Sequence, residues 1–267
     1  MPDQSSMPSV LETFRVAGYS CLRCGKCCTR AAGDNSVYLM PDEIESIRSF
    51  LIQKNIQIDG QDISSSFTVP LFPDIYSENG DDSVFDLKKI SDNLRLLQNQ
   101  ISEDGAVYTF GEMLKRTQNG TCVFLDTETN TCKIYDVRPL LCQTYPFFID
   151  FYNVDLEHRS NVDVIECECD GVASVSETDN SICNELAGLL MTRARREKED
   201  YEKMKKHIRA DYFLTSGAGL SQAEDDLKNG FLRFFVCDCR GVFEIKIRVN
   251  DFFLNTVKTD GTDEKGI

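Results

Sequence analysis

Four of the twelve cysteines of this chain lie in one short loop, Cys21-Leu-Arg-Cys24-Gly-Lys-Cys27-Cys28. Cys21, Cys24 and Cys27 recur at every third residue, so a single tight turn would direct three sulfur atoms at one centre. Gly25 permits a positive φ where the backbone must curl, and the two basic residues of the loop would offset thiolate charge. Cys28 leaves the backbone in a different direction from Cys27, so we do not expect both to bind one ion. The loop therefore predicts a cysteine-ligated metal centre.

The role of cysteine depends on the compartment in which a chain folds. Residues 1–6 contain neither the basic segment nor the apolar segment of a secretory signal. No apolar run approaches the roughly 18 residues of a membrane-spanning helix. We therefore expect a cytoplasmic protein with no membrane partner, in which the cysteines serve metal or redox chemistry rather than a disulfide framework.

Composition narrows the classes of partner. The 267 residues are 41% hydrophobic and 27% charged, which is typical of a globular protein with a sizeable core. A net charge of −15 argues against nucleic acid, because phosphates would be repelled. With only His158 and His207, histidine is a minor source of metal ligands. A protein partner or protein substrate stays open, and its identity is not given by composition.

Secondary-structure patterns surround the cysteine loop. A short strand is predicted over residues 36–40, and Pro41 is suited to open the helix that follows. Residues 56–84 are rich in Pro, Ser, Asp and Gly, so we expect a surface insertion there. Apolar residues at helical spacing predict a helix over 87–101, and a strand follows over 106–110.

The middle of the chain brings further cysteines to the loop. A hairpin with strands over 121–125 and 131–135 carries Cys122 and Cys132 near its two ends. A short helix after Pro139 carries Cys142. These cysteines are remote in sequence from the loop, and we expect the fold to deliver them to it.

The rest of the chain predicts regular structure. A strand pair is expected over 147–152 and 162–165, and a long helix over about 176–212. A terminal hairpin is expected from strands at 231–236 and 242–249. The fold class is therefore α+β, with small hairpins and short helices around the metal centre, followed by a long helix and a C-terminal hairpin.

The domain organisation follows from the same patterns. We assign residues 15–172 to a cysteine-cluster metal-binding domain. Residues 173–267 form the long helix and terminal hairpin, which we expect to pack on the first domain.

The cysteine pattern, taken with its neighbours, resembles a known family. The loop Cys21-x2-Cys24-Gly-x-Cys27-Cys28 is followed by Cys122 and by Cys132-Lys-Ile-Tyr-Asp-Val-Arg-Pro-x2-Cys142, and then by Tyr-Pro-Phe. This resembles the YkgJ-type cysteine-cluster family, a zinc- or iron-chelating CxxCxxCC domain that is also found in the flagellin lysine N-methylase FliB. The resemblance covers roughly residues 18–172. It implies eight metal ligands: Cys21, Cys24, Cys27, Cys28, Cys122, Cys132, Cys142 and Cys169.

One departure from the family pattern lies at the last ligand. Family members usually end the motif with Cys-Pro-Gly, whereas this chain has Cys169-Asp-Gly. The difference concerns the local turn more than the sulfur ligand.

The choice of metal rests on spacing. The Cys-x2-Cys-x2-Cys run resembles the first three ligands of a bacterial ferredoxin cluster, whose fourth ligand is remote. Zinc sites usually use two Cys-x2-Cys knuckles, and only Cys21 with Cys24 supplies one here. The pattern favours an iron–sulfur cluster, [4Fe–4S], over zinc. Eight cysteines are enough for two four-ligand sites, or for one site with additional structural or redox cysteines.

Three classes of function follow. The first is a metal-binding protein that carries an iron–sulfur cluster and has a redox or accessory role. The second is a protein lysine N-methyltransferase, which the resemblance to FliB implies although the chain has no recognisable methyl-donor motif. The third is a zinc-stabilised interaction module. Whether the protein is an enzyme is left open.

Other features have two interpretations each. Arg138 either makes a surface ion pair or donates towards the cluster or its cysteines. The basic stretch 193–209 either docks an acidic partner or is a solvated helix face, which its acidic pairs favour. Residues 216–219 are expected to form a flexible loop. The remaining cysteines form either a separate metal site or buried packing: Cys167, Cys183, Cys237 and Cys239.

Overall fold

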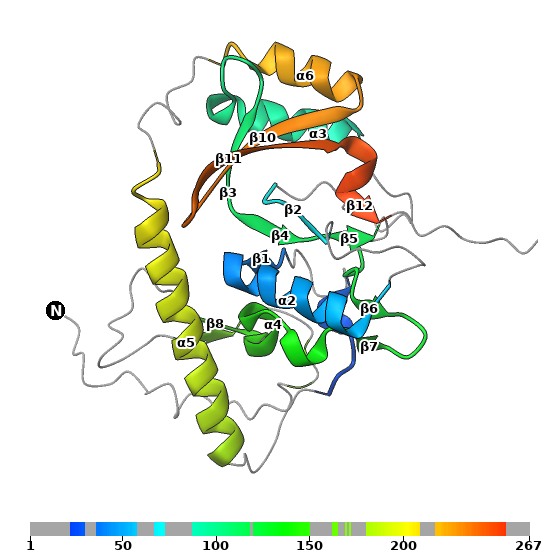
Figure 1. Ribbon diagram of the computed structural model, residues 1–267, viewed down its shortest axis with the longest axis vertical. Coiled ribbons are helices and arrows are strands. Elements are labelled where there is room, and N and C mark those ends of the chain that lie inside the picture. Colours follow the sequence, from blue (N-terminus) through cyan, green and yellow to red (C-terminus); the bar gives the residue numbers. More distant parts are fainter. Residues whose placement is uncertain are drawn as a thin grey trace, which may run out of the picture.

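The computed structural model describes residues 22–29, 36–57, 67–72, 87–117, 120–149, 162–164, 169, 171, 180–208 and 217–254. Helices and strands are mixed, which confirms the α+β class (Figure 1). Two hydrophobic cores lie one above the other in this view, and one long helix runs along their side. The cysteine loop belongs to the lower core.

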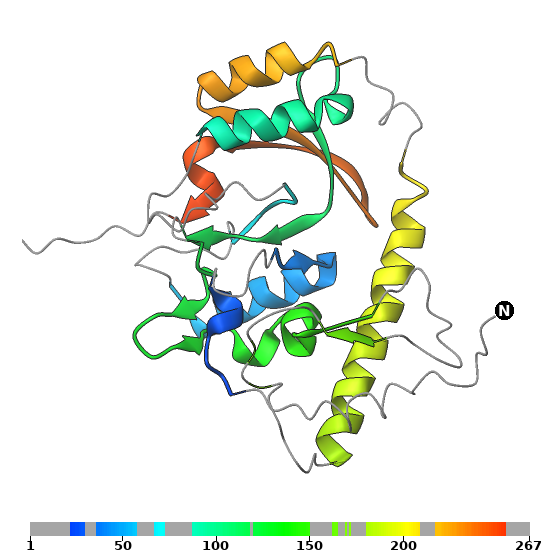
Figure 2. The ribbon, with the colours of Figure 1, turned by 180° about the vertical axis from the view of Figure 1, so that it is seen from behind.

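The upper layer is a three-stranded sheet with the order β11-β10-β3. Strand β10 (Phe231–Asp238) pairs antiparallel with β11 (Gly241–Arg248) and parallel with β3 (Val107–Phe110). Helices α3 (Leu87–Leu96) and α6 (Leu220–Lys228) lie together above the sheet in both views (Figures 1 and 2). The predicted terminal hairpin is confirmed, and its register runs from Phe231 opposite Arg248 to the turn.

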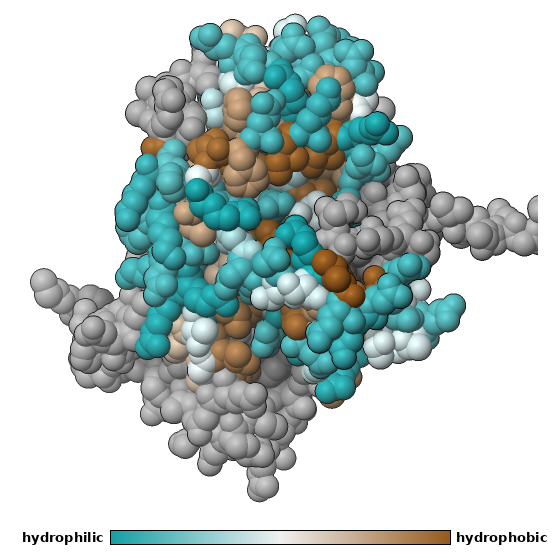
Figure 3. Space-filling view, viewed as in Figure 1, coloured by the Kyte–Doolittle hydropathy of each residue, from teal (hydrophilic) through white to brown (hydrophobic). Residues whose placement is uncertain are grey.

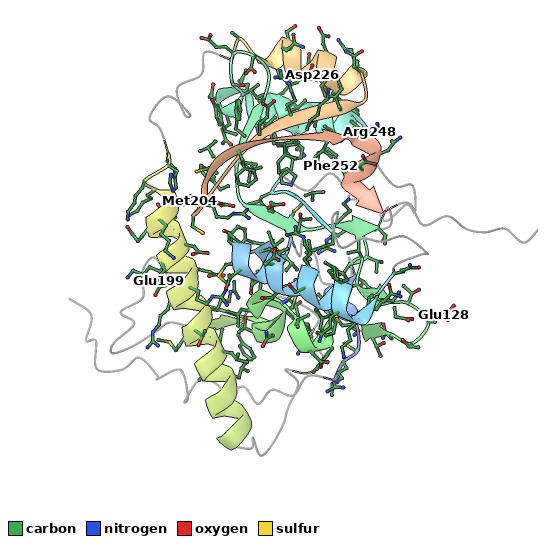
Figure 4. All side chains as sticks on the ribbon, in the orientation of Figure 1. Glu128, Glu199, Met204, Asp226, Arg248 and Phe252 are labelled. Carbon is green, nitrogen blue, oxygen red and sulfur yellow. The ribbon has the colours of Figure 1, made fainter. Side chains whose placement is uncertain are left out.

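Alternation along β10 builds the upper core. Leu232, Phe234 and Val236 are fully buried, because a strand directs every second side chain to the same face. The Phe72 ring packs edge-on against that of Phe234, with centroids 5.6 Å apart. Phe252 lies below the sheet in Figure 4 and joins the same cluster. It belongs to the 3-10 helix η8 (Val249–Phe252).

The lower layer is built on helix α2 (Pro41–Lys54). Pro41 opens this helix as predicted, and the apolar stripe of Ile44, Ile47 and Leu51 is buried. A second sheet, with the order β1-β4-β2, lies between α2 and the upper layer. Its strands are β1 (Tyr38–Leu39), β4 (Glu112–Leu114) and β2 (Thr68–Pro70), all antiparallel.

Short elements that carry cysteines, or lie close to them in sequence, are found beside α2. They are the 3-10 helix η2 (Lys26–Cys28), the hairpin strands β6 (Leu125–Asp126) and β7 (Thr131–Cys132), the 3-10 helix η5 (Tyr135–Val137) and helix α4 (Leu140–Thr144). Seen from behind, η2 lies between the hairpin and α4 (Figure 2). The predicted hairpin and the predicted short helix are both confirmed.

The remaining elements connect the layers. Strand β5 (Arg116–Thr117) pairs with β12 (Phe253–Leu254), and β8 (Phe147–Ile149) pairs with β9 (Val162–Val164). Helix α5 (Asn180–Met204) contacts α4, β8 and β10, and so bridges the lower and upper layers. A short 3-10 helix, η4 (Gln98–Gln100), follows α3. Residues near the end of the predicted helix over 87–101 thus tighten into a 3-10 turn.

The surface in Figure 3 reflects this arrangement. Hydrophilic residues cover α5, whereas hydrophobic residues gather over β10 and β11. Glu199 on α5 and Glu128 at the end of the β6–β7 hairpin both point away from the protein in Figure 4, and both are exposed. No helix in the described ranges is long and apolar enough to cross a membrane.

Two sequence expectations were wrong in part, and one helix was not predicted. Within the predicted surface insertion 56–84, residues 67–72 are part of the structure's interior. Phe67, Val69 and Phe72 are 1–3% exposed, because β2 adds to the edge of β4 and brings its apolar side chains into both cores. The other residues of the insertion are outside the described ranges, apart from 56 and 57 at the end of α2.

The long helix is shorter than predicted. It ends at Met204, and residues 205–207 form a turn. Its last buried apolar residue is Ala194, so the helix beyond that point has little apolar surface to bury and rests on local ion pairs. The predicted start at Ser176 lies outside the described residues.

The predicted flexible loop at 216–219 precedes a helix that the sequence analysis missed. Gly219 is buried immediately before α6, and a Cβ there would overlap the carbonyl oxygen of Ser102. Glycine is therefore required by close packing of α6 against the chain after η4.

One sheet takes strands from both predicted domains. Strand β3 comes from residues 15–172 and β10 from residues 173–267, and their backbones are hydrogen-bonded. The division at residue 172 stays a prediction.

The close approach at Gly219 gives a stability prediction. We expect Gly219→Ala to lower the free energy of unfolding by about 1–3 kcal/mol, since the added methyl group must displace backbone. Gly188→Ala is the matched control, because Gly188 is a helical glycine with nothing near its Cβ position. That change should stabilise the protein by up to about 1 kcal/mol. Urea unfolding of both variants checks the pair, and equal stabilities would contradict the packing argument.

Candidate metal centre

Seven cysteines line one pocket of about 330 Å³. They are all predicted ligands, and they come from η2, the hairpin, α4 and the segment that follows β9: Cys24, Cys27, Cys28, Cys122, Cys132, Cys142 and Cys169. The eighth predicted ligand, Cys21, lies outside the described residues. The fold therefore brings together sulfur atoms that are separated by more than a hundred residues of sequence.

The cysteine loop is shaped by a glycine. Gly25 has φ 72°, and a Cβ there would overlap the side-chain amide of Asn130. The Asn130 amide nitrogen donates to the carbonyl oxygen of Cys24. Cys28 donates its backbone N–H to the Gly25 carbonyl over 2.8 Å, which closes the turn. The predicted role of Gly25 is thus explained, and Asn130 is a contact that the sequence did not reveal.

The hairpin is joined directly to this loop. The backbone N–H of Cys122 donates to the carbonyl of Cys28 over 2.7 Å. Across the hairpin, Cys132 is the register partner of Leu125, and the Lys133 N–H donates to the Phe124 carbonyl over 2.8 Å. These backbone bonds place Cys122 and Cys132 at the wall of the same pocket.

A buried carboxylate holds the helix that carries Cys142. Glu43, on α2, is 8% exposed and accepts two backbone hydrogen bonds. One comes from Leu140, the first residue of α4, over 2.7 Å, and the other comes from Met40 over 3.0 Å. Burial raises the pKa of Glu43, and the two N–H donors oppose that shift. The link from Glu43 to α4 joins residues 97 positions apart, so only the tertiary structure reveals it.

The other end of α4 is held from α5. The Arg193 guanidinium is buried and donates to the hydroxyl of Thr144 over 3.1 Å. It is also paired with Glu197 at 2.7 Å, and Arg196 is paired with Asp42 on α2. The beginning of the basic stretch 193–209 is therefore an internal contact. The expectation of a solvated helix face is wrong for Arg193, because α4 covers it.

The thiols in the pocket differ in acidity. Cys27 and Cys28 have sulfur atoms 3.9 Å apart. The pKa of Cys27 is lowered to about 7 by the hydrogen bond from Cys28, with help from the charge of Arg138. The interaction between Cys28 and Cys122 lowers the pKa of Cys122 and raises that of Cys28. These shifts favour, at Cys27 and Cys122, the thiolate that metals bind.

Burial has the largest effect on the pKa of two further thiols in the pocket. It raises the pKa of Cys132 to about 11, and it raises the pKa of Cys142 well above its usual range. A metal cation would have to displace protons from both.

Arg138 lies against this group. Its guanidinium stacks over the Tyr135 ring at 3.8 Å, and its Nε donates to the Tyr135 carbonyl over 3.2 Å. Its charge lowers the pKa of Cys27 and opposes the effect of burial on Cys132 and Cys142. Within the described ranges it makes no ion pair with an acidic residue. These contacts favour the interpretation in which Arg138 acts on the cysteines.

The described cysteine sulfur atoms line an open volume and do not converge on one ion position. Among the described residues, no group of three or more His, Cys, Asp or Glu side chains is already arranged around a single ion position. The donor set nevertheless fits thiophilic metals, because every predicted ligand that lines the pocket is a sulfur atom. The cysteine-ligated centre itself is a proposal.

Of the cysteines outside the family pattern, Cys237 and Cys239 do not line this pocket. Cys237 is buried in β10, as the packing interpretation expected. Burial, with the charge of Asp200, raises the pKa of Cys239 at the hairpin turn. Cys167 and the side chain of Cys183 lie outside the described residues. The separate metal site stays a prediction, while Cys169 lines the pocket described above.

Comparison with known proteins agrees with this geometry. The CxxCxxCC family, described as a "Putative zinc- or iron-chelating domain", matches residues 20–170, which is more than half of the chain. The chain belongs to this family.

Matches to individual proteins add little information about the function of this chain. An uncharacterized protein of Methanocaldococcus jannaschii is 50% identical over 34 residues, which are 13% of this chain and 19% of that protein. The chain thus matches about a fifth of the length of that relative. No solved structure matches the chain.

The role of Glu43 can be tested by substitution. We expect Glu43→Ala to lower the free energy of unfolding by about 2 kcal/mol or more, since it leaves two buried N–H groups without an acceptor. The variant should also lose metal to a chelator faster than wild type, because α4 carries Cys142. Glu45→Ala is the control, since Glu45 is exposed on the same helix and pairs only with Arg48. If both variants unfold and release metal alike, Glu43 does not hold α4.

Proposed function

We propose that the pocket binds an iron–sulfur cluster and that the protein has a redox or accessory role. The observation that carries this proposal is the gathering of seven cysteines around one pocket of about 330 Å³. Membership of a zinc- or iron-chelating family supports metal binding in general. What we propose beyond metal binding is that the metal is an iron–sulfur cluster and that it has a redox or accessory role.

The number of sulfur donors supports a cluster. A structural zinc ion is enclosed by four ligands at about 2.0–2.3 Å, which leaves no open volume at its centre. This pocket has more cysteines than one zinc ion requires. Its volume falls at the lower end of the roughly 300–1,000 Å³ of cofactor sites. A polynuclear centre suits these numbers better than one ion.

We assign the ligands from sequence and position together. Cys21, Cys24 and Cys27 would supply three sulfur atoms from the loop, and Cys142 on α4 the remote fourth. The remaining pocket cysteines would serve a second site, or structural or redox roles: Cys28, Cys122, Cys132 and Cys169. An iron–sulfur cluster held there would supply one-electron transfer.

The surroundings of the pocket are suited to redox chemistry. Leu114, Phe124 and Tyr145 are buried at its wall, and an apolar wall limits the access of water, which tunes redox potential. Arg138 adds a positive charge that favours the more negative, reduced state. The zinc module and the lysine N-methyltransferase stay alternative predictions.

Anaerobic purification followed by iron, sulfide and zinc analysis tests the proposal. We expect iron and acid-labile sulfide, with visible absorption from charge transfer between thiolate and iron. A colourless protein that holds zinc after anaerobic preparation would refute the iron–sulfur assignment and favour the zinc module.

The loop ligands give a variant prediction. Cys24→Ser should abolish metal binding and lower the melting temperature, because metal binding contributes folding free energy. Cys239→Ser is the control, since Cys239 lies at the β10–β11 turn and does not line the pocket. Full metal content in the Cys24 variant would remove Cys24 from the ligand set.

The remote ligand is tested separately. We expect Cys142→Ser to destroy the cluster spectrum, because Cys142 is assigned the fourth position. Cys132→Ser and Cys169→Ser should leave that spectrum recognisable. If the spectrum survives in the Cys142 variant and is lost in either of the others, the fourth ligand is misassigned.

A further inference from the structure

Two guanidinium groups lie over a single aromatic ring at the pocket. The Arg23 guanidinium is 4.2 Å from the centroid of the Tyr135 ring, and that of Arg138 is 3.8 Å from it. All three residues line the pocket. Arg23 is exposed, whereas Arg138 and Tyr135 are half-buried. The stack therefore extends from the pocket wall to the surface.

Both arginines lack an acidic partner within the part of the chain that the structure describes. Over the described ranges, Arg23 and Arg138 form no ion pair with Asp or Glu, although many other arginines of the chain do, including Arg48, Arg193 and Arg233. Arg138 uses one N–H, its Nε, for the Tyr135 carbonyl. The planar ends of both groups remain as forked donors of the kind that bind carboxylates in pairs.

The local charge is opposite to that of the whole chain. The chain has 44 acidic and 29 basic residues, yet among the described residues that line the pocket one is acidic, Asp136, and five are basic. The basic ones are Arg23, Lys26, Lys115, Arg116 and Arg138. The described lining of the pocket is thus a basic patch on an acidic protein, and within it Lys115 is buried.

Thiolate charge accounts for part of this patch. The charge of Arg138 acts on Cys27, Cys132 and Cys142, and that of Arg116 acts on Cys122. Lys115 interacts with Asp251 instead. Arg23 is exposed, whereas Arg138 is half-buried. The exposed guanidinium of Arg23 is therefore available to a molecule that approaches from outside.

We propose that Arg23 and Arg138, stacked on Tyr135, form a docking site for an acidic segment of a partner protein at the mouth of the cysteine pocket. Stacking holds both guanidinium groups in place before binding, so less conformational freedom is lost when carboxylates arrive. This deepens the proposed function, because a partner docked here lies next to the metal centre.

Two observations favour a protein over a small anion. The pocket volume is assigned to the metal centre, which leaves the mouth as the recognition surface. Leu22, beside Arg23, is 59% exposed and is one of three exposed large hydrophobic residues in the described ranges. An apolar side chain beside the arginines can pack against an apolar residue of a protein partner, whereas a small carboxylate has no apolar part for it to contact.

The acidic remainder of the chain adds specificity. An acidic segment would be repelled from most of the surface, since the net charge is −15. The basic mouth is then the place at which it can settle, so repulsion elsewhere orients the partner. The contact should weaken as salt is added, because exposed charges are screened.

The test uses a fluorescein-labelled oligoglutamate peptide that ends in leucine, followed by fluorescence anisotropy with the full-length protein at low salt. We expect binding that Arg23→Gln weakens about tenfold, from the loss of charged hydrogen bonds. Arg138→Lys should also weaken it, because lysine keeps the charge but loses the fork. Leu22→Ser should weaken binding of the leucine-ended peptide and leave binding of plain oligoglutamate unchanged.

Matched controls make the result specific. Arg95→Gln removes an exposed arginine of α3, outside the pocket, and should bind peptide like wild type. A neutral oligoglutamine peptide should not bind. Peptide that fails to bind wild type, or that binds wild type and the Arg23 variant equally, overturns the proposal.

Two further measurements separate the possible failures. If citrate binds with the same Arg23 dependence and excludes the peptide, while Leu22→Ser has no effect, the ligand is a small carboxylate and the partner protein is refuted. Iron and sulfide analysis on the same samples reports the proposed function independently. Absence of iron with intact, Arg23-dependent peptide binding would refute the cluster and retain the docking site.

Discussion

The hydrogen bond from the Cys122 N–H to the Cys28 carbonyl is the contact on which the candidate centre depends. It joins the cysteine loop to the segment that leads into the hairpin, across a long separation in sequence. Asn130 adds a second link to the loop, from the hairpin itself. Sulfur atoms from both segments then face one pocket. Backbone pairing, rather than metal ligation alone, brings the donors together.

The third group of donors depends on buried polar contacts. Helix α4 is too short to be stable alone, and it is held by Glu43 at its first residue and by Arg193 at Thr144, its last residue. If either contact were broken, buried polar groups would lose their hydrogen-bond partners at a cost in free energy. Each contact therefore restricts where Cys142 can lie. Because Arg193 belongs to α5, and α5 also contacts β10, the position of Cys142 is connected to the upper layer.

The sequence by itself determined the chemical identity of the site. Cysteine spacing, the small number of histidines and the position of Gly25 predicted sulfur ligation before any fold was considered. Local patterns also predicted the helix from Pro41, the short helix that carries Cys142 and the terminal hairpin, because these depend on near neighbours and on alternation along the chain. Such features rest on short-range physics, which a sequence records directly.

The tertiary structure alone decided which residues meet. Residues 67–72 read as polar surface, yet pairing of β2 with β4 buries Phe67 and Val69. Gly219 suggested a flexible loop, although packing against Ser102 explains it. Glu43 and Arg193 looked like ordinary charged residues of helices, and only long-range contacts reveal that they hold α4. The sequence could not supply these roles, because each depends on a partner that folding brings from far along the chain.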